Sequence, residues 1–494
     1  MTSTQDYKYK LLRNAIILVH DENDHVKPHY NTDLLIEGDT IAAIGNDLAL
    51  PPPSQANIRI IDCTDKIVCP GLVDTHHHLW QTQLKGRHAD ESLLEYFPSG
   101  MMKSYCYRPD DIFWGQLSGS LEAIDAGTTF VLDHSHGCYT RESAEQALKA
   151  SVASGLRMVY ALAPAMRLQK WDKEQFVPVQ EAPVPDWQYD FVEDYCKQQP
   201  IAGRVGIGFG YDAWYMPEEY TKAVFERVRK AGIKVMTNHT VKNVVFDLDP
   251  AAQMQQYGLL DKDIVLSHGT STDMTEAQKK FLYDAGVSIS STPETECQMG
   301  MGWPIALDEN VHGSLGIDCH TSNSSSILIQ ARMLQQQIRQ KDGQKMLEEK
   351  TCRKKPLHSS EQLFNLATIQ GARAVGLGDE VGSIKTGKKA DLVIFEPTNS
   401  PSMLCSVEYD PMTAILRHSD IRDIDTVIIG GIVRKEGGKL LPVQVDSKEV
   451  AYSDVARSTL ASRKKLQERI NQTSWDKAYE AMIGMFYLDQ SKIV

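Results

Sequence analysis

The feature that most constrains the fold of this 494-residue chain is a regular alternation of short apolar runs and amphipathic stretches through its middle. The amphipathic stretches include predicted helices over 111–126, 217–231, 275–285 and 327–339. Strands that alternate with helices form parallel sheets, and eight such units over about 250–300 residues match a (β/α)₈ TIM barrel. The eight expected strands are 73–78, 128–133, 158–162, 205–209, 235–239, 264–268, 287–290 and 315–318.

β-rich segments flank this α/β centre on both sides. Short apolar runs surround Glu37-Gly38-Asp39, which is a turn sequence typical of a hairpin. Because neither segment is long enough to form a stable sheet alone, we expect the two to pair into one composite β-sandwich. The predicted strands of this part are 34–36, 41–44, 58–61, 67–68, 390–395 and 426–429. The predicted domains are the first half of the sandwich at 1–68, a metal-binding barrel at 69–380, the second half of the sandwich at 381–446 and a helical tail at 447–494.

Two connections and the tail each allow two interpretations. The segments 84–108 and 165–199 are unusually long, and in a barrel such loops rise over the face that holds active sites, although surface decoration is the alternative. Ser359–Gln362 has the pattern of a capping box that opens a helix reaching about Val375. The tail has two apolar stripes, which either dock on their own chain or join copies of it into a homo-oligomer. The stripes are Val455, Thr459, Leu466 and Ile470, then Trp475, Tyr479, Met482 and Phe486.

Composition excludes several partners. The formal net charge of -13 argues against nucleic acid, because phosphate binding needs clustered Lys and Arg. No apolar run is long enough for a membrane span or a signal peptide, so we expect no membrane partner. The nine cysteines include no C-x-x-C pair, a pattern typical of reduced thiols, and we predict a cytoplasmic protein.

A histidine motif closes the first barrel strand. In a strand, residues two apart point to the same side, so His76 and His78 can aim both imidazoles at one point while His77 turns away. Imidazole is a good ligand for a borderline ion such as Zn²⁺. An isolated H-x-H motif is weak support for a metal site.

Polar residues at three later strand ends strengthen the case. His239, His268 and Asp318 each follow a predicted strand, and the strand ends of one barrel converge on one mouth. Three neutral imidazoles and one carboxylate would leave a divalent ion near a net charge of +1, with an open position for water. The sequence therefore predicts one divalent cation, with Zn²⁺ favoured by the imidazoles and Fe²⁺ or Mn²⁺ as alternatives.

The chain resembles the amidohydrolase superfamily, in the branch of the triazine chlorohydrolases and the guanine, 8-oxoguanine and adenosylhomocysteine-type deaminases. The resemblance covers nearly the whole chain. It implies a barrel with a split sandwich, which agrees with the strand pattern above. The matching motifs are 35–45, 70–78, Gly316-Ile317-Asp318 with Ser322-Asn323, and 382–393.

The resemblance also implies roles for the residues at the barrel mouth. His76, His78, His239 and Asp318 would hold a single metal ion, and His268 would lie beside the attacked carbon. Asp318 would take the proton of the attacking water and later pass it to the leaving group, and His268 would stabilise the charge that develops.

One position departs from the family pattern. Deaminases of this branch carry a glutamate three residues after the fifth-strand histidine, where this chain has Lys242. We expect Lys242 to face solvent or an acidic residue. Glu294 or Glu296, after the seventh strand, could replace the missing carboxyl group, and Glu294 is the predicted substrate contact, with surface exposure as the alternative.

Further residues near the strand ends are candidates for the pocket wall. Gln81 matches a substrate-contacting glutamine of some relatives, and Trp80 is a predicted substrate contact. Trp80, together with Tyr211 and Trp214, could stack on a flat ring. Asp133-His134 and His320 could shape the pocket, although packing roles are the more ordinary interpretation of each.

Three functions remain open at this point. The favoured one is a deaminase-like hydrolase of a non-peptide C–N bond in a small cyclic or heterocyclic molecule. The alternative enzyme is a metal-dependent lyase or decarboxylase on the same site, which Lys242 leaves open. A non-enzymatic scaffold is disfavoured because such relatives generally lose their ligands, and this chain has the whole set.

Overall fold

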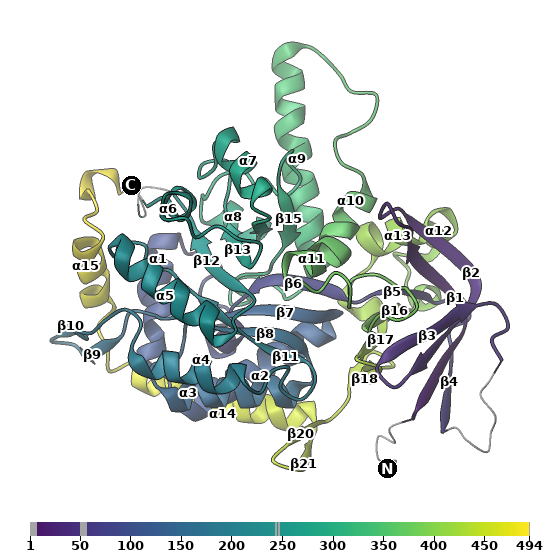
Figure 1. Ribbon diagram of the computed structural model, residues 1–494, viewed down its shortest axis with the longest axis horizontal. Coiled ribbons are helices and arrows are strands. Elements are labelled where there is room, and N and C mark those ends of the chain that lie inside the picture. Colours follow the sequence, from purple (N-terminus) through teal and green to yellow (C-terminus); the bar gives the residue numbers. More distant parts are fainter. Residues whose placement is uncertain (1–6, 50–56, 243–244, 246–247, 494) are drawn as a thin grey trace.

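The computed structural model describes residues 7–49, 57–242, 245 and 248–493, and it places a barrel beside a separate β-sheet (Figure 1). Within the described residues, eight parallel strands run in the order β15-β14-β13-β12-β11-β8-β7-β6, which confirms the predicted TIM barrel. The strands are β6 (Leu72–His77), β7 (Thr128–Ser135), β8 (Arg157–Leu162), β11 (Val205–Gly210), β12 (Met236–Thr240), β13 (Ile264–His268), β14 (Ser288–Ser291) and β15 (His312–Leu315).

The eighth strand differs from its prediction, which placed it at 315–318. Strand β15 ends at Leu315, because the chain then turns toward β6 instead of continuing beside β14. Backbone N–H groups of Ile317 and Asp318 both donate to the carbonyl of His76, at 3.0 and 2.8 Å, and His78 N donates to the carbonyl of Asp318 at 3.1 Å. These bonds join the first and last strands of the barrel.

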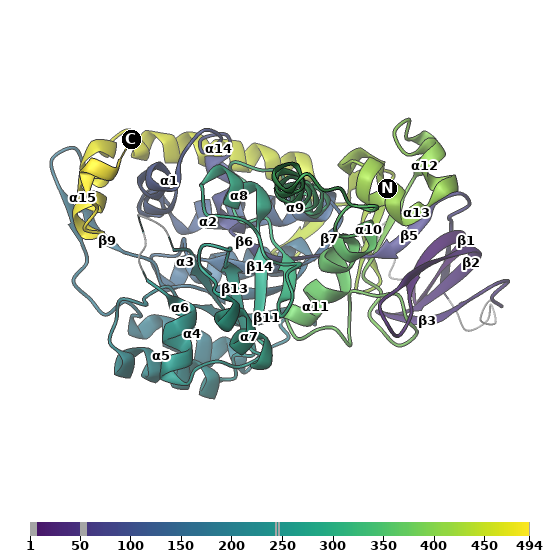
Figure 2. The same ribbon diagram turned by 90° about the horizontal axis from the view of Figure 1, so that it is seen from above.

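Helices cover the outside of the barrel (Figure 2). The four helices predicted from the sequence are present, and α9 runs ten residues past its predicted end and projects from the body (Figure 1). Its last turns carry helix-forming but mainly polar residues, so the apolar pattern stops before the helix does. The barrel helices are α2 (Pro109–Asp125), α3 (Arg141–Ser154), α4 (Asp186–Cys196), α5 (Glu218–Ala231), α6 (Pro250–Tyr257), α7 (Glu276–Asp284), α8 (Pro293–Gln298) and α9 (Ile327–Glu349).

The terminal segments pair into one sheet, as predicted. Antiparallel pairing of β5 with β16, from Ile67 against Phe395 to Pro70 against Leu392, joins the N-terminal strands to the C-terminal ones. The nine described strands share one continuous sheet, and a second apolar core packs against it. They are β1 (Tyr9–His20), β2 (Val26–Glu37), β3 (Thr40–Gly45), β4 (Ile58–Asp62), β5 (Ile67–Pro70), β16 (Leu392–Phe395), β17 (Ile424–Ile429), β18 (Ile432–Glu436) and β19 (Lys439–Leu440).

Two hairpin turns from opposite ends of the chain meet in this sheet. Gly38 lies in the predicted β2–β3 turn at φ +60°, and Gly431 lies in the β17–β18 turn at φ +72°. A Cβ atom on Gly431 would stand 2.0 Å from the carbonyl oxygen of Gly38, so only glycine fits this contact.

The predicted capping box is also present. The Ser359 hydroxyl accepts from Gln362 N, and the Gln362 side chain accepts from Ser359 N. The helix that it opens is α10 (Ser360–Asn365), which continues through a π-helical turn (Leu366–Gln370) into α11 (Gly371–Ala374).

The C-terminal tail docks on its own chain. Helix α14 (Tyr452–Ile470) lies along α2 and buries the predicted stripe of Val455, Thr459, Leu466 and Ile470. Helix α15 (Trp475–Met485) packs with the hairpin of β9 (Leu168–Trp171) and β10 (Phe176–Pro178). A contact between copies through this tail stays a prediction.

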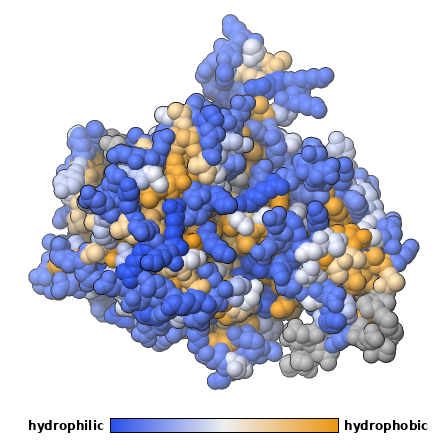
Figure 3. Space-filling view, viewed as in Figure 1, coloured by the Kyte–Doolittle hydropathy of each residue, from blue (hydrophilic) through white to orange (hydrophobic). Residues whose placement is uncertain are grey.

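The surface in view is mainly hydrophilic, with smaller apolar areas (Figure 3). Across the described residues, no helix combines the length and apolar character needed to cross a membrane. All nine cysteines lie in the described part of the chain, and each is an unpaired thiol.

A buried ion pair ties the barrel to the sheet, and its loss tests this architecture. Arg157 on β8 donates to both carboxylate oxygens of Asp391, at 2.7 and 3.0 Å, and both side chains are almost fully buried. We expect Asp391→Ala to lower the free energy of unfolding by about 3–5 kcal/mol, because it leaves a buried guanidinium unpaired. Asp194→Ala, which breaks an exposed pair with Arg141, should cost less than about 1 kcal/mol in the same denaturant titration. Equal losses in the two variants would contradict this view of the interface.

Candidate metal centre

Five side chains converge at the carboxyl ends of the barrel strands. The Asp318 Oδ1 atom lies 3.0 Å from His78 Nε2 and 3.3 Å from His76 Nε2, and His78 Nε2 lies 3.2 Å from His239 Nε2. Donor atoms of His76, His239, His268 and Asp318 all lie within 4.8 Å of one another. The structure thus brings together every residue that the sequence predicted for the metal centre.

The far nitrogen of each strand histidine is already engaged. His78 Nδ1 donates to the carbonyl of His134 at 2.7 Å, and His239 Nδ1 donates to Asp212 Oδ2 at 2.9 Å. Both acceptors lack hydrogens, so the Nε2 atoms carry the lone pairs. His76 Nδ1 lies 2.7 Å from the Ser267 hydroxyl, which allows the same tautomer. Such outer partners orient metal-binding imidazoles.

The donor set fits a divalent cation. Two nitrogen lone pairs that face each other at 3.2 Å repel unless a positive charge lies between them. His76 Nε2 is buried and forms no hydrogen bond within the described residues. Imidazoles with one carboxylate are the ligands that Zn²⁺ accepts most readily, so the chemistry of the site matches a metal ion.

Backbone strain is concentrated at two of these residues. His268 and Asp318 adopt φ values of +70° and +65°, in the left-handed region that residues with a side chain seldom occupy. His268 is the last residue of β13 and Asp318 follows the end of β15, so these backbone conformations set the directions of both side chains. Strain of this kind persists where the surroundings enforce it, often at functional sites.

Burial and neighbouring groups keep His76, His268 and Asp318 in the protonation states that a metal site needs. Burial lowers the pKa of His76 well below its usual range, and it lowers the pKa of His268 to about 4. Burial alone would raise the pKa of Asp318, but the adjacent His76 and His78 imidazoles hold it well below its usual range. At neutral pH His76 and His268 are therefore neutral and Asp318 is ionised.

The site opens toward His239. The side chains of His76, His78 and Asp318 are at most 6% exposed, whereas those of His239 and Asp212 are 27% and 32% exposed. A substrate would therefore enter on the side of β12.

A second histidine pair lies beside the first; sequence reasoning named His134 as a possible pocket residue but missed His136. His134 and His136, at the end of β7, are both buried, and His134 Nε2 lies 3.1 Å from Asp212 Oδ2. The His136 ring stands 4.1 Å from that of His78 between centroids. The available signal was the same H-x-H spacing that marks His76 and His78.

The first long loop closes the site, as predicted. Its helix α1 (Leu93–Ser99) carries Tyr96, whose hydroxyl accepts from Gln81 Nε2 at 2.7 Å and from the Cys319 thiol at 3.3 Å, next to Asp318. Gln81 Oε1 is buried and has no partner among the described atoms. Trp80 is fully buried with its ring 5.7 Å from that of His136.

The two glutamates after β14 have different surroundings. Glu296 is buried, accepts from Thr292 N at 2.7 Å and lies 3.9 Å from His268 Nδ1. Glu294 instead accepts from Gln330 on α9 at 2.6 Å. Residues two apart on a helix point in nearly opposite directions, so only one of them can face the mouth. The structure brings Glu296 next to His268 and places Glu294, the predicted substrate contact, against α9.

Lys242 is partly exposed and lies near an acidic residue, as we expected. Its ammonium group lies 3.9 Å from Asp249 and its side chain is 42% exposed. The position that holds a catalytic glutamate in related deaminases therefore faces outward here.

Three other candidates lie in packing positions. Tyr211 and Trp214 pack against each other and against Phe225 on α5, which gives them no place in the predicted stacking wall. His320 Nδ1 lies 2.6 Å from His77 Nε2, on the side of β6 away from the metal cluster.

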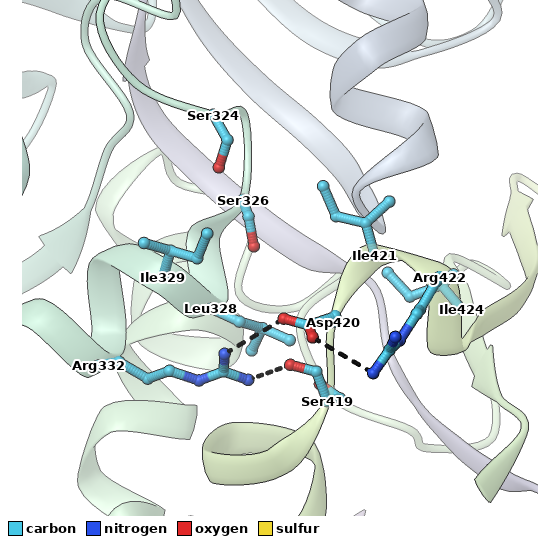
Figure 4. Close-up of a pocket in the computed structure, with 10 residues that line it drawn as sticks. All are labelled: Ser324, Ser326, Leu328, Ile329, Arg332, Ser419, Asp420, Ile421, Arg422 and Ile424. Carbon is cyan, nitrogen blue, oxygen red and sulfur yellow. Dashed lines mark hydrogen bonds and ion pairs between the residues drawn. The ribbon is translucent and has the colours of Figure 1, made fainter. Parts of the chain in front are cut away.

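A separate cavity of about 320 Å³ lies between the start of α9 and the segment 419–424 (Figure 4). Its Arg332 guanidinium donates to the carbonyls of Leu416 and Ser419. Because the Arg332 guanidinium already donates to these carbonyls, this cavity is a weaker candidate for the functional site than the barrel mouth.

Asp212 offers a direct test of how the site is held. We expect Asp212→Asn to weaken the affinity for Zn²⁺ by about 10–100-fold, because His239 loses the carboxylate that fixes its ring. Competition with a chromogenic chelator measures this affinity. An unchanged affinity in a folded variant would contradict the role of Asp212 in orienting His239 for the ion.

Known proteins with similar sequences identify the family to which this chain belongs. The model of the amidohydrolase family matches residues 67–433. The 5-methylthioadenosine/S-adenosylhomocysteine deaminase of Acetivibrio thermocellus is 26% identical over 81% of this chain and 89% of its own. The 5'-deoxyadenosine deaminase of Methanobrevibacter smithii is 27% identical over 89% of this chain and 95% of its own.

Solved structures share the fold. The atrazine chlorohydrolase of Arthrobacter aurescens TC1 complexed with zinc superposes with a TM-score of 0.72 at 20% identity, over 92% of this chain and 100% of that chain. The adenosine deaminase of Xanthomonas campestris with bound zinc gives 0.73 at 19% identity, over 93% and 98%. Since the family model covers most of its length, this chain belongs to the amidohydrolase family and is a metal-dependent hydrolase of carbon–nitrogen bonds other than peptide bonds.

Proposed function

We propose that this enzyme deaminates a small heterocyclic molecule of the purine-nucleoside type, using one zinc ion held by His76, His78, His239 and Asp318. The observation that carries the proposal is the convergence of the imidazole nitrogens of His76, His78 and His239 and the carboxylate of Asp318 at the barrel mouth. The substrate class rests on the deaminases to which the chain is similar. A cytoplasmic location is part of the same proposal.

The ion would supply Lewis acidity, which lowers the pKa of water from 15.7 to about 7 and makes it a nucleophile at neutral pH. Overall, the oxygen of water replaces the amino group on a ring carbon, and ammonia leaves. The remaining steps are proton transfers and charge stabilisation by the chain itself.

Asp318 would handle the proton of water. Its carboxylate is ionised at neutral pH, so one oxygen can accept that proton and return it to the departing nitrogen. His268 is neutral, with Nδ1 2.8 Å from the Thr292 hydroxyl, and could hydrogen-bond the substrate as charge develops.

Glu296 would protonate the ring nitrogen, in place of the glutamate that Lys242 replaces. Burial raises the pKa of Glu296 to about 8, so its carboxyl group keeps a proton at neutral pH. Its Oε2 atom is buried without a hydrogen-bond partner in the described part of the chain. Gln81 and Trp80 remain our predicted substrate contacts, since both are buried beside the metal residues.

A substrate screen tests the reaction. Zinc-loaded enzyme should release ammonia from at least one member of a panel of adenine nucleosides, guanine, pterins and aminotriazines. Asp318→Asn should lower kcat by about 10²–10⁴-fold, because the proton acceptor is lost, whereas Asp249→Asn, beside Lys242, should stay near the wild-type rate. Release of CO₂ instead of ammonia would favour the lyase alternative and contradict the proposal.

The two glutamates allow a matched test of the proton donor. Glu296→Gln should lower kcat by about 10²–10⁴-fold, while Glu294→Gln should leave it nearly unchanged. An acid acts in its protonated form, so wild-type kcat should fall as pH rises through about 8. A pH–rate profile with the same alkaline limb in Glu296→Gln would rule out this role.

A further inference from the structure

A second cavity lies on the outer side of the loop that closes the active site. Its volume is about 450 Å³, and it separates the 84–108 loop from the junction of α14 and α15. Tyr96 of the same loop faces the metal residues, as described above. The cavity is lined by Arg87, Glu91, Ser99, Lys103, Ile470, Asn471, Thr473 and Trp475.

Lys103 is the charged side chain of the cavity wall that is most deeply buried. Its side chain is only 4% exposed, and its ammonium nitrogen lies 4.2 Å from the centre of the Trp171 ring. Glu91, on the same cavity wall, is the carboxylate whose charge acts on this ammonium group. Burial lowers the pKa of Lys103 to about 8, so the charged form remains accessible at neutral pH.

Arg87 and Arg463 add to the positive charge. Arg87 donates to the side-chain oxygen of Gln467, but its Nε atom is buried and unpartnered in the described structure. Arg463 is close enough to lower the pKa of Arg87, after the larger effect of burial, and it donates to the carbonyl of Lys85. The Glu91 carboxylate acts on Arg87 in the opposite direction, with a smaller effect than burial or Arg463.

The cavity has one negative group to offset these cations. Glu91 accepts from the Ser99 hydroxyl, and its Oε2 atom lies 3.9 Å from His88 Nε2. Arg469, further along α14, is already paired with Asp111. Two cations, Arg87 and Lys103, and one carboxylate, Glu91, therefore line the cavity, and Arg463 lies close to Arg87. The positive groups outnumber the negative one, and poorly solvated charge is costly unless a counter-charge accompanies it.

We propose that this cavity binds a phosphate-type oxyanion, carried on a small organic molecule or free in solution. Lys103 and Arg87 would contact the oxyanion, and the Ser99 hydroxyl and Asn471 amide are further hydrogen-bonding groups on the wall. The cavity has room for several water volumes of about 30 Å³ each, so it can hold more than a bare phosphate. Trp475, at the rim, is 38% exposed and offers a flat apolar surface to the organic part.

This ligand would link two parts of the molecule. Arg87 and Lys103 belong to the loop over the active site, and Asn471 and Trp475 belong to the tail. Trp171 also bridges them, because its indole N–H donates to the carbonyl of Ser474 at 2.8 Å. The bound oxyanion would therefore fasten the tail onto the back of the loop, independently of the proposed deamination.

Calorimetric titration of the zinc-loaded enzyme tests the site, with inorganic phosphate and adenosine monophosphate as the two probes. We expect saturable binding of one equivalent, and at least tenfold weaker binding in both Lys103→Met and Arg87→Gln. Lys464→Met removes one exposed positive charge from α14 and should bind as the wild type does. Melting temperatures without phosphate check that each variant is folded, and the two substitutions act independently if one of them fails.

The outcomes of these titrations distinguish a phosphate ester from the free anion, and this cavity from the metal centre. Adenosine monophosphate that binds at least tenfold more tightly than phosphate would identify a phosphate ester as the occupant, and equal affinities would identify the free anion; both support the proposal. Absence of saturable binding at 50 mM (about the highest practical concentration) would overturn it. Binding that survives in Lys103→Met and Arg87→Gln but is lost in Asp318→Asn would also overturn it, because the anion would then occupy the metal centre.

Discussion

Backbone hydrogen bonds that close the barrel between its first and last strands fix the positions of the candidate metal ligands. Ile317 and Asp318 both donate to the carbonyl of His76, and His78 donates back to the carbonyl of Asp318. The Asp74 carboxylate reinforces this closure, since it accepts from the backbone N–H groups of His76 and Ile317. Candidate ligands from the two ends of the barrel are therefore held together by backbone hydrogen bonds.

Around this closure, each remaining group has a fixed orientation. Ser267, Asp212 and the carbonyl of His134 hold the far nitrogens of the three imidazoles, so little rearrangement is needed when an ion enters. The positive φ values of His268 and Asp318 show that the backbone is strained to present both side chains. The fold thus stabilises an arrangement that isolated strands would not adopt.

Much of the fold and the metal donors could be predicted from the sequence, because strand periodicity and the ends of parallel strands determine where side chains meet. The eighth strand was misplaced because hydrogen bonds to His76, which no local pattern reveals, redirect the chain after Leu315. The choice between Glu294 and Glu296 depends on the orientation of a short helix against α9, and that orientation is set by tertiary packing. Tyr96 lies on a loop whose path over the site has no periodic signature.

The central claim is that one cation occupies the space between His76, His78, His239 and Asp318. Anomalous diffraction at the zinc absorption edge, from crystals of the purified protein, tests it most directly. We expect a single strong peak about 2.0–2.2 Å from the Nε2 atoms of the three histidines and from an oxygen of Asp318. Absence of a peak in zinc-soaked crystals, or a peak bound by other residues, would contradict it.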